Sequence, residues 1–155
     1  MKYIAQEDFY DCGVACVAMM LSHFDMHPPY MDVFDIVKPN PTYGSTLDDL
    51  KRGFNHYGLN MNVFNNSTIL DLTSNDDPKI VAYSVDVPHY AIFFKDKGGH
   101  IQLYDPFFGP DTHYTKGKFI RKWKVARHMY SKDVNNMLDL DGKESNKLFI
   151  TVKQK

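Results

Sequence analysis

The chain of 155 residues is short of several features that define common protein classes. Its two cysteines stand only four positions apart, so they cannot bridge distant parts of a fold, and no segment has the pattern of a secretory signal peptide. No apolar run approaches the roughly 20 residues of a membrane-spanning helix. A net charge of −1 without a long basic run gives no basis for nucleic-acid binding. We therefore expect a protein of a reducing, cytoplasmic compartment.

Other absences narrow the chemistry. The histidines show no metal-ligand spacing, and no Gly-rich phosphate-binding loop ending in Lys-Ser or Lys-Thr occurs. We therefore expect no metal and no other cofactor. The basic residues between Lys116 and Arg127 predict the solvated face of a helix rather than a phosphate-binding surface.

The hydrophobic pattern predicts helices first and strands later along the chain. We expect helices over 12–24 and 30–37, a third capped by Ser45 with Asp48 completing a capping box, and short helical segments at 68–72 and 119–124. Strands are expected over 59–64, 79–85, 89–94, 101–104, 125–130 and 147–152. The polar residues 131–146 fit either an ordered loop or a flap. This order predicts an α+β fold with the N-terminal helices packed on an antiparallel sheet.

A cysteine stands at the start of the first predicted helix, which is apolar on nearly all sides, as is typical of a helix buried in a core. The unpaired N–H groups at a helix N-terminus favour the thiolate of a cysteine placed there. The side-chain amide of Gln6, together with the backbone N–H of Cys12, is suited to hold an oxyanion. We expect Cys12 to be a nucleophile, Cys16 to be a core residue, and Asp11 to cap the helix rather than to serve as a carboxylate at the edge of the site.

A base and its orienting partner are expected in one β-hairpin. His89 begins an apolar run, a turn signal follows at 96–99, and the returning run ends at Asp105. A turn centred near Lys97 would place His89 and Asp105 about opposite each other, where Cβ atoms lie roughly 4.5–5.5 Å apart. The carboxylate could then accept one imidazole N–H while the other ring nitrogen faces the thiol. A slip of one residue would separate the pair, and the turn type is not fixed by the sequence. Singly, His89 could be a core histidine and Asp105 a turn residue.

These residues also carry a resemblance to a known family. The chain resembles the bacteriocin-processing cysteine peptidases, which are double-glycine leader peptidases of papain-like fold, over about residues 1–123. The matching blocks are Gln6, Asp11-Cys12-Gly13, Ala15-Cys16, Gly44-Ser45-Thr46-Leu47 with Gly58, Pro78-Lys79-Ile80, His89-Tyr90, Asp105-Pro106 and Gly109. The resemblance implies a catalytic Cys12, a general base His89, an orienting Asp105 and an oxyanion-hole Gln6.

The chain departs from the family in two ways. After Trp123 the usual glycine is replaced by Lys124-Val125, and about 30 residues then follow without a match. We expect one papain-like domain over 1–155, in which residues 124–155 are an extension that completes the sheet. The family domain usually forms the N-terminal part of an exporter with a membrane domain and an ATPase. Neither is found in this sequence, so a free-standing peptidase is expected.

The resemblance implies a cysteine endopeptidase that removes the leader of a precursor peptide, such as a bacteriocin, after a double-glycine-type site and through a thioester. The implied partners are a precursor with a helical leader and a separate membrane exporter, which would hold the enzyme at the inner face of the membrane. Two alternatives stay open. One is a papain-like acyltransferase with the same triad, and the other is a non-catalytic docking module, in which the cysteine is commonly lost. The sequence leaves the precursor and the oligomeric state unassigned.

Overall fold

The computed structural model describes residues 1–125, 129 and 147–155, and five helices and six strands lie within them. In chain order the elements are α1 (Cys12–His23), α2 (Tyr30–Val37), α3 (Leu47–His56), β1 (Leu59–Phe64), α4 (Ile69–Leu72), β2 (Lys79–Ser84), β3 (Pro88–Asp96), β4 (His100–Asp105), β5 (Gly109–Thr115), α5 (Lys116–Lys122) and β6 (Phe149–Gln154).

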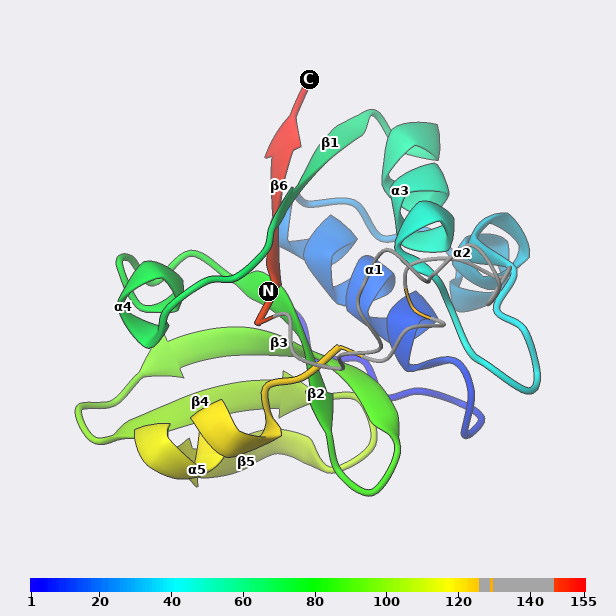
Figure 1. Ribbon diagram of the computed structural model, residues 1–155. Helices are drawn as coiled ribbons and strands as arrows, with labels where there is room; N and C mark the ends of the chain where they lie inside the picture. Colours follow the sequence, from blue (N-terminus) through cyan, green and yellow to red (C-terminus); the bar gives the residue numbers. More distant parts are fainter. Residues whose placement is uncertain (126–128, 130–146) are drawn as a thin grey trace.

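The strands form one antiparallel sheet in the order β1-β6-β2-β3-β4-β5. Helices α1, α2 and α3 gather on one side of this sheet, and α5 lies on the other (Figure 1). The α+β fold expected from the sequence, with N-terminal helices on an antiparallel sheet, is therefore confirmed.

Most of the expected elements are confirmed, and two points differ. Strand β5 was not expected. The cap of α3 was placed one residue too early: Thr46 accepts the N–H of Asp49 at 3.2 Å, and Asp49 accepts the N–H of Thr46 at 2.9 Å. The strand expected over 125–130 falls mostly, and the loop or flap over 131–146 entirely, outside the described residues.

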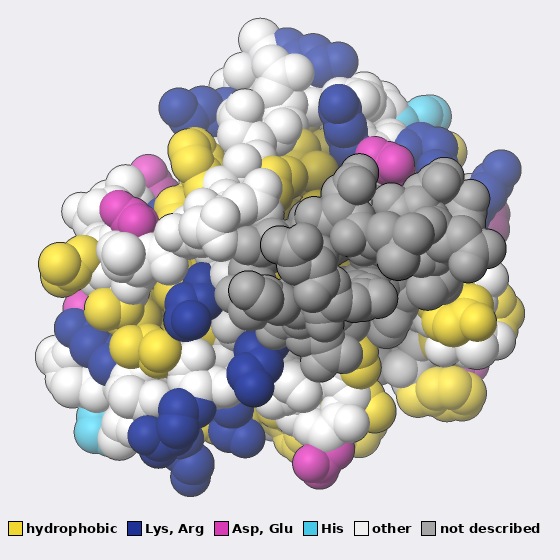
Figure 2. Space-filling view, viewed as in Figure 1, with side chains coloured by type: hydrophobic (Ala, Val, Ile, Leu, Met, Phe, Trp, Pro, Cys, Tyr) yellow, Lys and Arg dark blue, Asp and Glu magenta, His cyan; other side chains and the backbone are white. Residues whose placement is uncertain are grey.

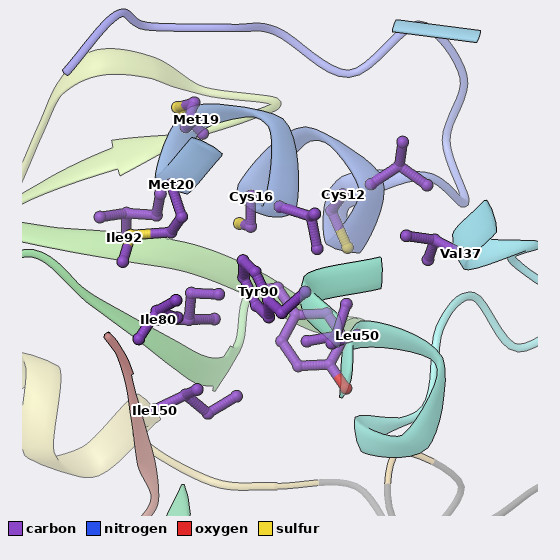
Figure 3. Packing of buried hydrophobic residues seen from close by; sticks show 14 of the residues in the cluster. Cys12, Cys16, Met19, Met20, Val37, Leu50, Ile80, Tyr90, Ile92 and Ile150 are labelled. Atoms are coloured by element: carbon purple, nitrogen blue, oxygen red, sulfur yellow. The ribbon is translucent and has the colours of Figure 1, made fainter. Parts of the chain in front are cut away.

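Two cores form because side chains of a strand alternate between the faces of the sheet. Tyr90 and Ile92 of β3 pack with α1, while Ala91 and Phe93 pack on the opposite face with Trp123, which follows α5. Figure 3 shows α1 resting on the sheet, with Tyr90 and Ile92 among the side chains beneath it. Eleven residues of α1, Cys12 to Ser22, are buried, as its apolar composition predicts.

The first turn of α1 lies very close to the segment before α3. A Cβ atom at Gly13 would come within 2.9 Å of Ser45 Cβ, so only glycine permits this approach without displacement. The hydroxyl of Tyr90 donates to the carbonyl of Ser45 at 3.0 Å. The segment around Ser45 is thereby held against the start of α1.

The basic residues of α5 lie on the outer surface, where Lys and Arg side chains gather over this helix (Figure 2). Lys118 and Arg121 are exposed, and Lys116 pairs with Asp96 at 3.0 Å. This arrangement agrees with the solvated helix face that the sequence predicts.

Candidate active site

The loop before α1 is folded around Asp11. The Asp11 carboxylate is fully buried and accepts the backbone N–H groups of Glu7 at 3.0 Å and Asp8 at 2.9 Å. It also accepts the hydroxyl of Tyr30 at 2.7 Å. Asp11 holds the N-cap position of α1, as expected, but its side chain makes no cap hydrogen bond to the helix. The carboxylate instead shapes the loop that leads to Cys12.

Cys12, His89 and Asp105 come together at the start of α1. Cys12 lies close enough to His89 to contribute to raising the pKa of that imidazole. Nε2 of His89 donates to Oδ1 of Asp105 at 2.7 Å, and an ionised carboxylate can only accept. The other ring nitrogen, Nδ1, is therefore the one available to the sulfur. Cys12 is 7% exposed, His89 5% and Asp105 0%, so the three groups form a buried line whose sulfur end is its most accessible part.

The strand register differs from the one expected. Ile92 pairs with Tyr104 and Phe93 with Leu103, with an irregularity after Phe93. Continuing this register places Asp105 beside Ala91, two residues from His89 on the same face of β3. Diagonal neighbours of this kind lie about 7–8 Å apart at Cα, within reach of two long side chains. His89 and Asp105 make the expected contact although they are not paired as expected. A shift of two residues keeps their side chains on the same face of the sheet.

Four donors hold the Asp105 carboxylate. Besides His89, Oδ1 accepts the backbone N–H groups of Phe107 at 2.8 Å and Phe108 at 2.9 Å. Oδ2 accepts the hydroxyl of Tyr83, a fully buried residue of β2. Sequence reasoning did not single out Tyr83. The pairing of β2 with β3 places Tyr83 opposite His89, so a prediction of this pairing would have pointed to Tyr83.

These contacts set the protonation states. Burial lowers the pKa of His89, but hydrogen bonds with Asp105 and Cys12 outweigh it and raise the pKa of His89 to about 10. Burial raises the pKa of Asp105, but its bonds to His89 and Tyr83 and the charge of His89 hold that pKa below its usual range. At neutral pH the site thus holds an imidazolium between a carboxylate and the sulfur.

Gln6 is fixed beside the same hairpin. Its backbone N–H donates to the carbonyl of Pro106 at 3.0 Å, while Tyr3 donates its hydroxyl to the carbonyl of Asp105 at 2.6 Å. The side-chain Nε2 of Gln6 donates to the carbonyl of Asp8 at 2.5 Å, and Oε1 is buried without a partner among the described residues. Gln6 therefore lies next to the loop that carries Asp105, with a buried amide oxygen unsatisfied.

Cys16 has a different environment from Cys12. It lies one turn further along α1, inside the helix–sheet core (Figure 3), and is fully buried. Burial raises the pKa of its thiol well above the ordinary value, and the negative charges of Cys12 and Asp105 act in the same direction. The core role expected for Cys16 agrees with this burial.

A cavity of about 260 Å³ opens beside Cys12. Its wall includes the Gly44-Ser45 segment on one side and Val87-Pro88 on the other. Gly44 has a φ of +74°, a conformation that side-chain-bearing residues rarely adopt. Phe9, Tyr43 and Val87 line the same cavity and are at least half exposed. The cavity therefore combines an apolar rim with a wall that includes the backbone of Gly44.

A helix-borne cysteine in contact with a strand-borne histidine and aspartate, on an α+β scaffold, defines a cysteine peptidase of papain-like fold. The Peptidase C39 family matches residues 1–133, and the chain belongs to this family.

The chain is similar to a curated relative, the lactococcin-G-processing and transport ATP-binding protein LagD of Lactococcus lactis subsp. lactis. The two are 26% identical over 125 residues, which is 79% of this chain and 18% of that protein. The chain thus spans less than a fifth of the relative's length.

Solved structures share the fold. A double glycine motif protease from an AMS/PCAT transporter, in complex with a leader peptide, matches with a TM-score of 0.76 at 18% identity, over 99% of this chain and 91% of that one. The peptidase domain of Streptococcus ComA matches with a TM-score of 0.75 at 17% identity, over 99% and 100% of the two chains.

Two features are absent from the part of the chain that the structure describes. Within them, no group of three or more His, Cys, Asp or Glu side chains is arranged to hold a metal ion. In the same part of the chain, none of the helices has the length and apolarity needed to cross a bilayer.

Proposed function

We propose that the chain is a cysteine endopeptidase that removes the leader from a precursor peptide after a double-glycine-type site. The observation that carries this proposal is the buried line from Cys12 through His89 to Asp105, formed at the edge of a cavity in a member of the Peptidase C39 family. Cys12 is present and lies beside a histidine that can act as its base, which argues against a non-catalytic docking module.

In this proposal Cys12 is the nucleophile, and its sulfur attacks the carbonyl carbon of the second small leader residue. The backbone N–H of Cys12 and the amide of Gln6 stabilise the oxyanion. For Gln6 this requires its amide to turn, because the N–H₂ group now bonds the Asp8 carbonyl and the unsatisfied oxygen is buried. The side chain must therefore leave the Asp8 carbonyl to bring its N–H₂ group to the oxyanion.

His89 moves the protons in both half-reactions. Its imidazolium gives a proton to the leaving amine, which frees the downstream peptide and leaves the leader as a thioester on Cys12. The neutral ring then takes a proton from water, and the resulting hydroxide attacks the thioester. The leader departs with a new carboxylate, and the imidazolium and thiolate are restored. Asp105 orients the ring throughout and does not exchange a proton.

The cavity beside Cys12 gives a physical reason for small residues before the cut. Ser45 is held at the first turn of α1 by its close approach to Gly13 and by the hydrogen bond from Tyr90, so this part of the wall is fixed in place. An extended backbone without side chains fits such a wall. The apolar rim formed by Phe9, Tyr43 and Val87 is available to leader residues further upstream.

The proposed partners follow from the same relatives. The LagD protein is named for both processing and transport, and one solved relative holds a leader peptide. We infer that this chain binds a helical leader and works beside a membrane exporter, which would place it at the cytoplasmic face of the membrane.

The nucleophile is tested with purified protein and a synthetic precursor containing a Gly-Gly leader. Mass spectrometry should show cleavage after the second glycine by the wild type and by Cys16→Ala, and none by Cys12→Ala. Cleavage by Cys12→Ala, or none by the wild type, would contradict the proposal. Adding a small amine separates hydrolysis from acyl transfer, because an acyltransferase would return the leader as an amide of that amine.

Substrate choice is tested with the same precursor carrying Val-Val at the cut. We expect no cleavage, because the proposed fit places the backbone of these two residues against Gly44 and Ser45, where branched side chains would clash. The Val-Val precursor should still inhibit cleavage of the Gly-Gly form, since leader binding is separate from the fit at the cut. Cleavage of both precursors at equal rates would point to a cysteine peptidase of another specificity.

A further inference from the structure

Two adjacent aromatic residues stand exposed at the turn between β4 and β5. Phe107 is 64% and Phe108 55% exposed, and their rings meet edge to face with centroids 4.9 Å apart. The ring of Phe108 also lies edge-on to His89, with a centroid distance of 6.3 Å. The pair is therefore continuous with the candidate active site.

Hydrogen bonds fix the backbone of this turn. Both backbone N–H groups bind Oδ1 of Asp105, and the carbonyl of Pro106 accepts the N–H of Gln6. Any residue type except proline could supply the same two N–H groups. Orienting Asp105 thus explains the backbone of the turn but does not explain two exposed phenylalanines. Apolar surface is unfavourable in water at roughly 25 cal/mol per Å².

The proposed chemistry gives the two sides of Cys12 different tasks. The acyl half of the substrate stays on the sulfur, beside the cavity lined by Phe9, Tyr43 and Gly44. The amine half leaves with a proton from His89, so its nitrogen must lie within about 3 Å of that ring. The first residue after the cut therefore lies on the His89 side, where Phe108 is in contact with the ring.

Resting on the proposed function, we propose that Phe107 and Phe108 form a binding surface for the first two residues after the cut, and that it selects apolar or aromatic side chains there. The occupant is the start of the released peptide, not its leader. The turn thus has two separate roles: its backbone orients Asp105, and its side chains select the first residues of the released peptide. Neither phenylalanine lines the cavity beside Cys12, so in this proposal the leader and the released peptide are recognised at different places.

The test uses two precursors that differ only after the Gly-Gly site, one continuing with Leu-Leu and the other with Ser-Ser. We expect the wild type to cut the Leu-Leu precursor with a kcat/KM about tenfold higher. In the double variant Phe107→Ser/Phe108→Ser this ratio should fall close to one. Leu70→Ser is the matched control, because Leu70 is 76% exposed on α4 and its loss should leave the ratio unchanged.

The outcomes are distinguishable. A wild type that cuts both precursors equally, or a double variant that keeps the tenfold ratio, overturns the inference while leaving the proposed function intact. A double variant that loses activity on both precursors by the same factor also overturns it, because the phenylalanines would then only support the turn. Failure of the wild type to cut either precursor would instead contradict the proposed function.

Discussion

Replacing Asp105 with asparagine removes one negative charge while keeping the shape of the side chain. In the structure Oδ1 faces three N–H donors and Oδ2 faces the hydroxyl of Tyr83. The asparagine oxygen can take the place of Oδ1, and its N–H₂ can donate to the Tyr83 oxygen if that hydroxyl turns. The geometry is therefore retained, and the change tests the charge alone.

The expected size of the effect follows from the bond to His89. A hydrogen bond to a charged group contributes about 1.5–3 kcal/mol and one between neutral groups about 1 kcal/mol. Losing the charge should therefore weaken the support of the imidazolium by roughly 1.4 kcal/mol, and one pKa unit corresponds to 1.36 kcal/mol. We expect the pKa of His89 to fall by about one unit from its value of about 10. A similar loss in the transition state would lower kcat/KM about tenfold at pH 7.

The assay is a pH profile of kcat/KM for the wild type and for Asp105→Asn. Wild-type activity should persist until the pH rises through about 10, where His89 loses its proton. The variant should lose activity about one unit earlier. Asp96→Asn is the matched control, because Asp96 ends β3 and pairs with Lys116 on the outer surface. An alkaline limb that stays near pH 10 in Asp105→Asn would refute the reasoning.

Stability gives an independent measurement of the same charges. The folded pKa of Asp105 is depressed, so its contribution is present above the unfolded value of about 3.8 and is lost as the pH falls through the folded value. The folded pKa of His89 is raised, so its contribution is complete below the unfolded value of about 6.5 and is lost as the pH rises through about 10. Denaturant titrations should therefore show the largest difference between wild type and Asp105→Asn near pH 5–6.

Three further outcomes are expected. Iodoacetamide should label Cys12 in the native protein at neutral pH and leave Cys16 unlabelled until unfolding, as peptide mapping can show, because burial keeps the Cys16 thiol protonated. Gly13→Ala should lower the free energy of unfolding by about 1–3 kcal/mol, since the new methyl group meets Ser45 at 2.9 Å, and an unchanged denaturation midpoint would contradict this packing. Tyr83→Phe should lower that free energy by about 1.5–3 kcal/mol at pH 7 and by less once the pH falls through the depressed pKa of Asp105, where protonation of the buried carboxylate weakens the lost bond.

The helices and most strands were predictable because their patterns are local. Prediction failed for two reasons. In one case two neighbouring capping patterns fitted the sequence equally well, and in the others the deciding contact was with a residue far away in the sequence. Ser45 with Asp48 and Thr46 with Asp49 both satisfy the capping pattern, and the structure uses the second. The bond from Tyr90 to the Ser45 carbonyl and the close approach of Gly13 are long-range contacts that no local pattern contains. Strand β5 includes Pro110 and lacks an alternation of apolar and polar residues, so its own sequence does not predict a strand.

The site was predictable in its residues more than in its geometry. The sequence placed Cys12 at a helix start and put His89 and Asp105 in one hairpin. It did not give the position of the turn, which lies beyond the Asp96–Ile101 pair rather than around Lys97, nor the irregularity after Phe93 that shifts the register by one residue, because both depend on the assembled sheet. Tyr83 was missed for the same reason: its partner is Asp105, two strands away. Contacts across several strands depend on register, and register is a property of the assembled sheet.

The position of β6 has a consequence for how the chain acquires its structure during synthesis. This last strand lies between β1 and β2, and in the described residues it supplies the whole of the pairing of β1, from Leu59 with Gln154 to Phe64 with Phe149. The ribosome therefore releases the hairpin that carries His89 and Asp105 before the strand that ties β1 to it exists. Until then β1 presents an open edge, which is a template for unwanted association. We expect a nascent chain stalled before Leu148 to remain sensitive to protease, and full protection to appear only once Gln154 has emerged.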